Sequence, residues 1–274
     1  MNTNLRIGSI SRSLVAVLCI GGGLGACTTQ EASTGTGGKG GAAAGTGGAG
    51  GSVGSTETDG VTCPLPAKAL ITDFTYAPSD AGAATDFASF GDSTTLSGTE
   101  FVYPTGTGAL TSDVTKNNWH ISGTVGDYSG LGLVFFNCSR VNAAAYKGIS
   151  FTISGSVPTG NMITMGVGTL NNSITAAWLN THGETGKTSP GRCSPVSGTN
   201  QYDQPTCATA TKVIPITATP TTQKIMWADF TGGKPESGVT PTDIISVSAY
   251  FPWAGAGSAP YAADIVIDDL SFIP

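Results

Sequence analysis

The sequence predicts an all-β domain, and two observations carry this prediction. From residue 69 onward, apolar and polar residues alternate with a period of two, which places one face of a strand on a core and the other in water. These short segments are separated by Gly, Pro, Asn and Asp, and no strand–helix rhythm interrupts them. Many short strands without a long helix indicate an antiparallel sandwich or jelly roll.

Strand patterns recur along the whole predicted domain, with a single helical turn expected over 142–146. The strand candidates are 70–75, 119–125, 131–138, 149–153, 163–167, 213–217, 224–228, 245–251 and 264–272. The apolar phase of these strands predicts a set of buried side chains. They are Leu133, Phe135, Phe151, Ile153, Val247 and Ile267, together with Trp119 and Trp227, which fall in phase with apolar neighbours.

The first sixty residues predict export and a lipid anchor. Arg6 and Arg12 precede an apolar run that is too short to span a bilayer. Leu24-Gly25-Ala26-Cys27 then resembles a bacterial lipobox, so lipidation is expected at Cys27. Thr28 follows the lipid site in place of Asp, which resembles an outer-membrane destination within the cell envelope.

Composition divides the chain into three sections: a signal peptide over 1–26, the lipidated Cys27 with a disordered Gly-rich tether over 27–60, and a β-sandwich over 61–274. The chain carries 12 Lys and Arg against 18 Asp and Glu. Because there is no basic run, nucleic acid is not expected as a partner. Membrane association is expected through the lipid alone.

The cysteines of the domain are expected to form structural disulfides, because an exported protein folds in an oxidising compartment. Four cysteines allow three connectivities. Cys193 and Cys207 bracket a polar loop and are expected to pair locally, and Cys63 is then expected to pair with Cys138.

Four segments, in this order, resemble strands of galactose-binding-like jelly rolls. They are Ile71–Phe74 (I-T-D-F), Tyr146–Gly155 (Y-K-G-I-S-F-T-I-S-G), Trp227–Phe230 (W-A-D-F) and Ile265–Phe272 (I-V-I-D-D-L-S-F). Many such domains are carbohydrate-binding modules, including the group-11 type attached to glucanases. The resemblance implies a galactose-binding-like jelly-roll β-sandwich that binds a polysaccharide or other glycan.

The same resemblance implies a possible structural Ca²⁺ held by Asp73, Asp268 and Asp269, and no other cofactor. Ca²⁺ takes six to eight oxygen ligands. Thr72 and Tyr76 stand where further acidic residues are usual, which weakens the predicted site. The alternative is that Asp268 and Asp269 cap a strand end and bond to backbone or to Lys.

Aromatic residues at strand ends are the candidates for sugar contacts, because the apolar faces of sugar rings pack on aromatic rings. The candidate carbohydrate-binding residues are Trp178, Trp253, Tyr250, Asn180 and Asp203. Trp178 is expected to open a polar loop over 180–188. Packing in the core or in loops is the alternative role for each ring.

The sequence contains no marked catalytic motif, so no catalytic residue is assigned. A glycosidase needs two carboxylates that flank the scissile bond, and nothing in the sequence marks such a pair. Non-catalytic carbohydrate binding by a surface or periplasm-facing lipoprotein is therefore the expected function. The alternatives are a structural or protein-interaction module without a sugar ligand and, third, a glycan-acting enzyme.

Overall fold

The structure is a computed structural model that describes most of the predicted sandwich. The described residues are 66, 68–75, 89–90, 96–103, 108–114, 116–126, 128–135, 140–158, 160–182, 189–196, 206–253, 255 and 258–274. The signal peptide, Cys27, the tether, the Cys63–Cys138 pairing and Asp203 lie outside these residues. They therefore stay predictions.

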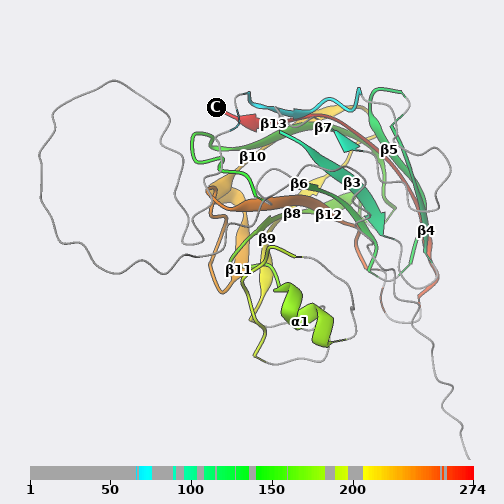
Figure 1. Cartoon of the computed structure of the whole chain (residues 1–274). Helices are drawn as coiled ribbons and strands as arrows, with labels where there is room; N and C mark the ends of the chain where they lie inside the picture. The colour runs from blue at the N-terminus through cyan, green and yellow to red at the C-terminus, as the bar shows by residue number, and fades with distance from the viewer. Residues whose placement is uncertain are drawn as a thin grey trace, which may run out of the picture.

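Across the described residues the strands form two sheets, and all of their ladder pairings are antiparallel (Figure 1). The first, called here the β7 sheet, has the order β10-β7-β13-β5-β4, with β1 paired to β13. The second, called the β12 sheet, has the order β11-β9-β8-β12-β6-β3-β2. The predicted all-β sandwich is confirmed.

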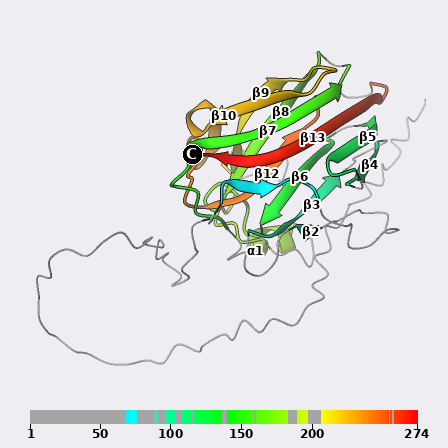
Figure 2. The same ribbon diagram turned by 90° about the horizontal axis from the view of Figure 1, so that it is seen from above.

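The strands of the β7 sheet are β1 (Leu70–Thr72), β4 (Ala109–Asp113), β5 (Trp119–Val125), β7 (Gly148–Ser156), β10 (Thr221–Met226) and β13 (Tyr261–Ile273). Those of the β12 sheet are β2 (Ser89–Phe90), β3 (Gly98–Tyr103), β6 (Gly130–Phe135), β8 (Met162–Thr169), β9 (Ala208–Pro215), β11 (Thr231–Lys234) and β12 (Ile244–Tyr250). Strands far apart in the sequence are neighbours in both sheets, and Figure 2 shows β13 running between β7 and β5.

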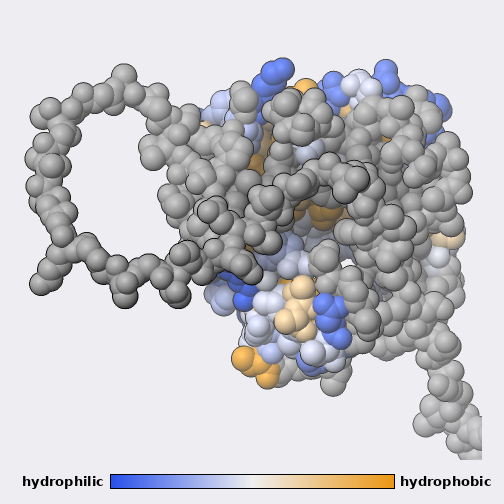
Figure 3. Space-filling model, in the orientation of Figure 1, coloured by the Kyte–Doolittle hydropathy of each residue, from blue (hydrophilic) through white to orange (hydrophobic). Residues whose placement is uncertain are grey.

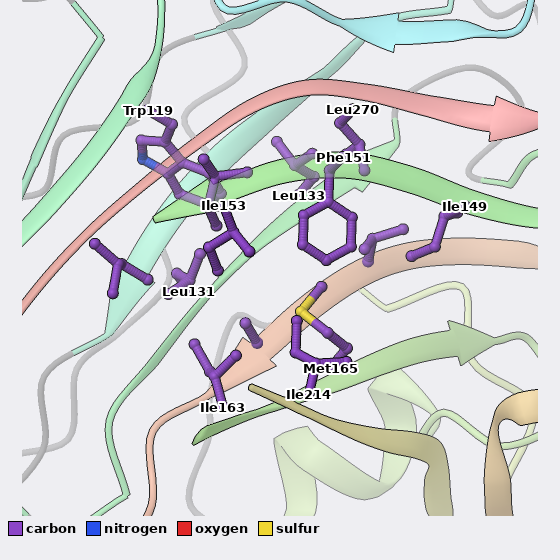
Figure 4. Close-up of a cluster of buried hydrophobic side chains, with 14 of the residues drawn as sticks. Trp119, Leu131, Leu133, Ile149, Phe151, Ile153, Ile163, Met165, Ile214 and Leu270 are labelled. Atoms are coloured by element: carbon purple, nitrogen blue, oxygen red, sulfur yellow. The ribbon is translucent and has the colours of Figure 1, made fainter. Parts of the chain in front are cut away.

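The core lies between the two sheets and is built from the apolar phase of their strands. In Figure 4, Phe151 and Ile153 point from β7 toward Leu131, Leu133 and Met165 on the facing strands. The residues predicted to be buried are buried: Leu133, Phe135, Phe151, Ile153, Val247, Ile267 and Trp119. Trp227 is partly buried and packs against the same core. Period-two alternation therefore identified these core residues.

Local structure differs from the prediction at several segments, of which 142–146 and 224–228 are two. Residues 142–146 form a hydrogen-bonded turn in place of a helical turn, with the Tyr146 N–H donating to the Ala143 carbonyl over 2.9 Å. The strand expected over 224–228 ends at Met226, and a 3-10 helix follows over Trp227–Asp229. The Asp229 carboxylate accepts the Met226 N–H at 2.9 Å, which turns the chain there.

The strands β2, β3, β4 and β11 were not predicted, and neither was the helix α1 (Ala176–Thr181). The helix replaces the start of the loop that the sequence predicts around Trp178. The Thr175 hydroxyl accepts the Trp178 N–H at 3.2 Å and thereby caps the helix. In Figure 1, α1 lies beyond the β12 sheet, on the side away from the β7 sheet.

The predicted disulfide between Cys193 and Cys207 is present, with Cα atoms 5.9 Å apart. It joins the segment that follows α1 to the start of β9. The Cys193 N–H also donates to the Ser173 carbonyl at 2.9 Å, and the Arg192 N–H donates to the Leu170 carbonyl at 2.8 Å. The disulfide thus holds in place the connecting segment between β8 and β9 that contains α1.

No helix among the described residues is both long and apolar enough to cross a membrane.

Truncating Phe151 tests the core. Phe151→Ala is expected to lower the free energy of unfolding by roughly 3–5 kcal/mol, because the ring is buried between the sheets. Ser154→Ala on the outer phase of the same strand is the matched control and should change it by less than about 0.5 kcal/mol. Urea denaturation followed by tryptophan fluorescence measures both. Equal effects of the two substitutions would contradict the assignment of faces.

Candidate functional site

Aromatic rings cover glycines on the outer face of the β12 sheet. Leu131 and Leu133 of β6 point into the core, so Gly130 and Gly132 between them face outward. The paired residues on β3 are Tyr103 opposite Gly130 and Phe101 opposite Gly132. A methyl group on Gly132 would lie 2.8 Å from the Cζ atom of Phe101, and one on Gly130 would collide with the Tyr103 ring. Both rings therefore reach across the neighbouring strand.

Tyr250 on β12 lies flat on the same face. Its hydroxyl accepts a hydrogen bond from the Ser248 hydroxyl, two residues back on the strand, at 3.0 Å. Its Cε2 atom would be 2.9 Å from a methyl group on Gly166 of β8. The ring thus lies along the sheet, above a strand that has no side chain at this point. Phe101 and Tyr103 also stack on each other, with ring centroids 5.9 Å apart.

A second aromatic pair lies just beyond the ends of β6 and β12. Trp253 and Tyr128 stack with centroids 5.4 Å apart and an interplanar angle of 24°. They are 47% and 52% exposed, respectively. Tyr128 precedes Gly130 by two residues, which is about 7 Å along a strand. The Tyr261 hydroxyl donates to the Pro252 carbonyl at 2.6 Å and holds the loop that presents Trp253.

We call these five residues and the strands beneath them the aromatic face. The rows across the sheet are Phe101–Gly132–Ser248–Gly166–Thr211 and Tyr103–Gly130–Tyr250–Thr164–Val213. Neither row of described residues includes a charged side chain. Four strand spacings of about 4.8 Å separate β3 from β9, so the rows extend over about 19 Å. Flat rings beside small hydroxyl-bearing residues suit a ligand with apolar faces and polar edges.

The predicted sugar-contacting residues fall in two places. Tyr250 and Trp253 belong to the aromatic face. Trp178 and Asn180 lie on α1, which follows the opposite end of β8, and Asp203 lies outside the described residues. Trp178 is half-buried and its ring stacks on His182, with centroids 3.8 Å apart and planes 6° apart. One face of that indole is therefore already covered, while Asn180 is exposed.

Phe101, Tyr103 and Tyr128 belong to the site but were not predicted. The signal that points to Phe101 and Tyr103 is the alternation of glycine with leucine in Gly130-Leu131-Gly132-Leu133. Glycine weakens a strand interior and marks positions where another group approaches closely. Outward glycines on a central strand therefore require large neighbours on the next strand.

The carboxylates proposed to hold Ca²⁺ lie at the junction of β1 and β13. The Asp73 carboxylate accepts the Thr75 hydroxyl at 2.6 Å, which lowers the pKa of Asp73. Burial raises the pKa of Asp268, and the charges of Asp269 and Asp73 add to that rise. Across the described chain, no three His, Cys, Asp or Glu side chains are grouped so that they could hold a metal ion. The calcium site stays a prediction.

His120 lies on the outer face of the other sheet, as its alternation with Trp119 and Ile121 predicts. Its Nε2 atom is 2.9 Å from an Asp264 carboxylate oxygen on the neighbouring strand β13. Both side chains are at least partly exposed, so the pair is a cross-strand contact of the sheet surface. It lies on the sheet opposite the aromatic face.

No protein-family model matches the chain, and no curated protein matches it in sequence. Among solved structures, it is similar to the family 11 carbohydrate-binding module of the cellulosomal cellulase Lic26A-Cel5E of Clostridium thermocellum. The match has 14% identity and a TM-score of 0.41 and covers 77% of this chain and 96% of that chain. A structure of the family 11 module from Clostridium thermocellum in complex with a β-1,3-1,4-mixed-linked tetrasaccharide matches with the same identity and TM-score, over 77% and 97% of the two chains.

An agarase, AgWH50C, is also similar, with 6% identity and a TM-score of 0.40 over 75% of this chain and 26% of the agarase chain.

The glycines under the rings can be tested by adding a methyl group. Gly132→Ala is expected to cost near the low end of the ~1–3 kcal/mol typical of overpacking, because the Phe101 ring can swing away. Gly148→Ala is the contrasting variant, since its methyl group would collide with the Ile225 backbone carbonyl across the β7–β10 pairing. Its cost should lie at or above the high end of that range. Urea denaturation compares the two, and equal costs would contradict the ring placement.

Proposed function

We propose that the domain binds a neutral glycan on the aromatic face and does not catalyse its conversion. The observation that carries the proposal is the exposed Trp253–Tyr128 pair next to rings that lie flat on the sheet. Stacked aromatic residues that are half exposed leave apolar surface in contact with water. The C–H faces of pyranose rings are suited to cover such surface.

The polar groups beside the rings fit the edges of the same ligand. Ser248, Thr164 and Thr211 supply hydroxyl groups in the two rows, and hydroxyl groups donate to and accept from sugar hydroxyls. The absence of charge among the described strand residues of this face favours a neutral polysaccharide over one built from uronic acids. The resemblance to carbohydrate-binding modules in the sequence motifs agrees with this proposal.

Trp253→Ala tests the proposal. Shallow aromatic sites bind weakly, so the wild-type domain is expected to bind its glycan with a Kd of roughly 10⁻⁵ to 10⁻³ M. Trp253→Ala should weaken binding at least about tenfold and leave stability near that of wild type, because the indole is 47% exposed. Leu70→Ala, at a similarly exposed residue of the β7 sheet, is the matched control and should bind like wild type.

Affinity gels of the purified domain with neutral and uronic-acid glycans measure these differences. Retention by no glycan would favour a structural or protein-interaction module. Release of reducing sugar from a bound glycan would favour an enzyme. Trp178→Ala reports separately on α1, and a loss of binding there would extend the site toward the helix.

We further propose that Cys27 is lipidated and that the Gly-rich tether presents the domain from the cell envelope. The lipobox and the composition of the tether support this proposal. Cys27→Ala should abolish incorporation of labelled palmitate and leave the precursor unprocessed. Ser9→Ala, inside the signal, is the control and should be processed normally. A mutant that is still acylated and cleaved would contradict the lipid site.

A further inference from the structure

Glu100 is a carboxylic acid in the hydrophobic core. It lies in the middle of β3 and is 1% exposed. It pairs with Leu133 of β6, and directly paired residues of an antiparallel ladder point to the same face. Leu133 points into the core, so Glu100 does as well.

The surroundings of Glu100 are apolar. The flanking pairs on the same face are Gly98 with Phe135 and Val102 with Leu131, and Val102 packs against the core. The Oε2 atom of Glu100 is buried and has no hydrogen-bond partner among the described atoms. An ionised carboxylate is strongly disfavoured in such a place, and a protonated carboxyl is the form that is tolerated.

Burial alone raises the pKa of Glu100 to about 8. The strands that pack most closely along the β3 backbone are β6, β2 and β4. In the described chain, β6 and β2 contain no ionisable side chain, and β4 contributes Asp113, which pairs with His120 on the outer phase of the β7 sheet. On β3 itself, Tyr103 is on the opposite face. The protonated form of Glu100 is thereby favoured.

β3 pairs with β6 over its whole length on one side. On the other side its described partners are Ser89 opposite Thr99 and Phe90 opposite Gly98 of β2. The ladder with β6 continues past Glu100 to Tyr103, and moving that end of β3 outward would break it.

We propose that Glu100 is a proton-dependent positioning residue for the aromatic face. While it is protonated, β3 stays seated on the core and holds Phe101 and Tyr103 over the glycines of β6. When the proton leaves for solvent, the carboxylate moves toward water, and β3 carries both rings away from the face. The consequence for ligand binding rests on the proposed function, whereas the motion of β3 does not.

The direction of the pH effect follows from the two states. The seated state keeps the Glu100 proton up to a pH of about 8, whereas an open state has the ordinary carboxyl pKa of 4.5. The seated state binds more protons between these values, so its stabilisation is complete below 4.5 and is lost as the pH rises toward 8. The ratio of open to seated molecules should rise up to about tenfold per pH unit in this window. Glycan affinity should fall as the pH rises.

Hydrogen exchange of the wild-type protein tests the motion directly. Mass spectrometry from pH 5 to 9, corrected for the intrinsic exchange rate, should show β3 amides losing protection as the pH rises and levelling off above about 8. The β7 amides serve as the internal reference for global unfolding. β3 should exchange faster than β7 at every pH. Exchange of β3 and β7 in step, or pH-independent protection of β3, would overturn the proposal.

Glu100→Gln separates ionisation from packing, because the amide has nearly the same shape and cannot lose a proton in this range. The pH dependence of β3 exchange and of glycan affinity should both disappear in this variant. Asp264→Asn removes an exposed carboxylate of the β7 sheet and should keep the wild-type pH dependence. If Glu100→Gln does not fold, the hydrogen-exchange data of the wild-type protein still show whether β3 moves with pH. If no glycan binds at any pH, the proposed function fails while the exchange result stands.

Discussion

The alternation of leucine and glycine along β6, which places them on opposite faces of the sheet, is the constraint on which both the core and the candidate site depend. Leu131 and Leu133 point between the sheets and pack with residues such as Phe151. Gly130 and Gly132 point outward and leave room for two aromatic rings from β3. A shift of the strand by one residue would exchange these faces, which would put glycines in the core and leucines under the rings. The same alternation therefore determines stability and the shape of the outer surface.

The core of this fold was predictable because it depends on periodicity, and β3 was missed because Glu100 breaks that periodicity. Where Gly98-Thr99-Glu100-Phe101 needs an apolar residue on the inward phase, the sequence has a carboxylic acid. The segment therefore does not match a strand pattern, and its aromatic residues were not included in the predicted site. Here burial between the two sheets outweighs the alternation of apolar and polar residues, because the acid is accommodated in its neutral form. Only the glycines of β6 indicate from the sequence that rings lie beside them.

The region between β8 and β9 shows a different limit. The sequence predicts its disulfide correctly, because two cysteines bracket a short polar loop. It does not predict α1, because a helix of six residues has little intrinsic stability and depends on its Thr175 cap and on tertiary contacts. Trp178 consequently stacks on His182 in place of opening a loop. In Figure 3, the coloured surface around α1 is mainly hydrophilic, with hydrophobic residues in small separate spots.

Two features that are unusual for strands lie on neighbouring strands of the β12 sheet. They are the outward glycines of β6 and the buried acid of β3. Outward glycines weaken β6. A buried carboxyl, whose Oε2 atom has no hydrogen-bond partner among the described residues, weakens β3 beside it. An apolar residue at position 100 and larger residues at positions 130 and 132 would satisfy local rules better. Sequences that break such rules do so most often where function requires it. The glycines of β6 allow two rings to lie flat, and the acid makes the position of both rings depend on a proton. The residues that lower the local stability of β3 and β6 and the exposed aromatic residues thus lie in the same part of the molecule.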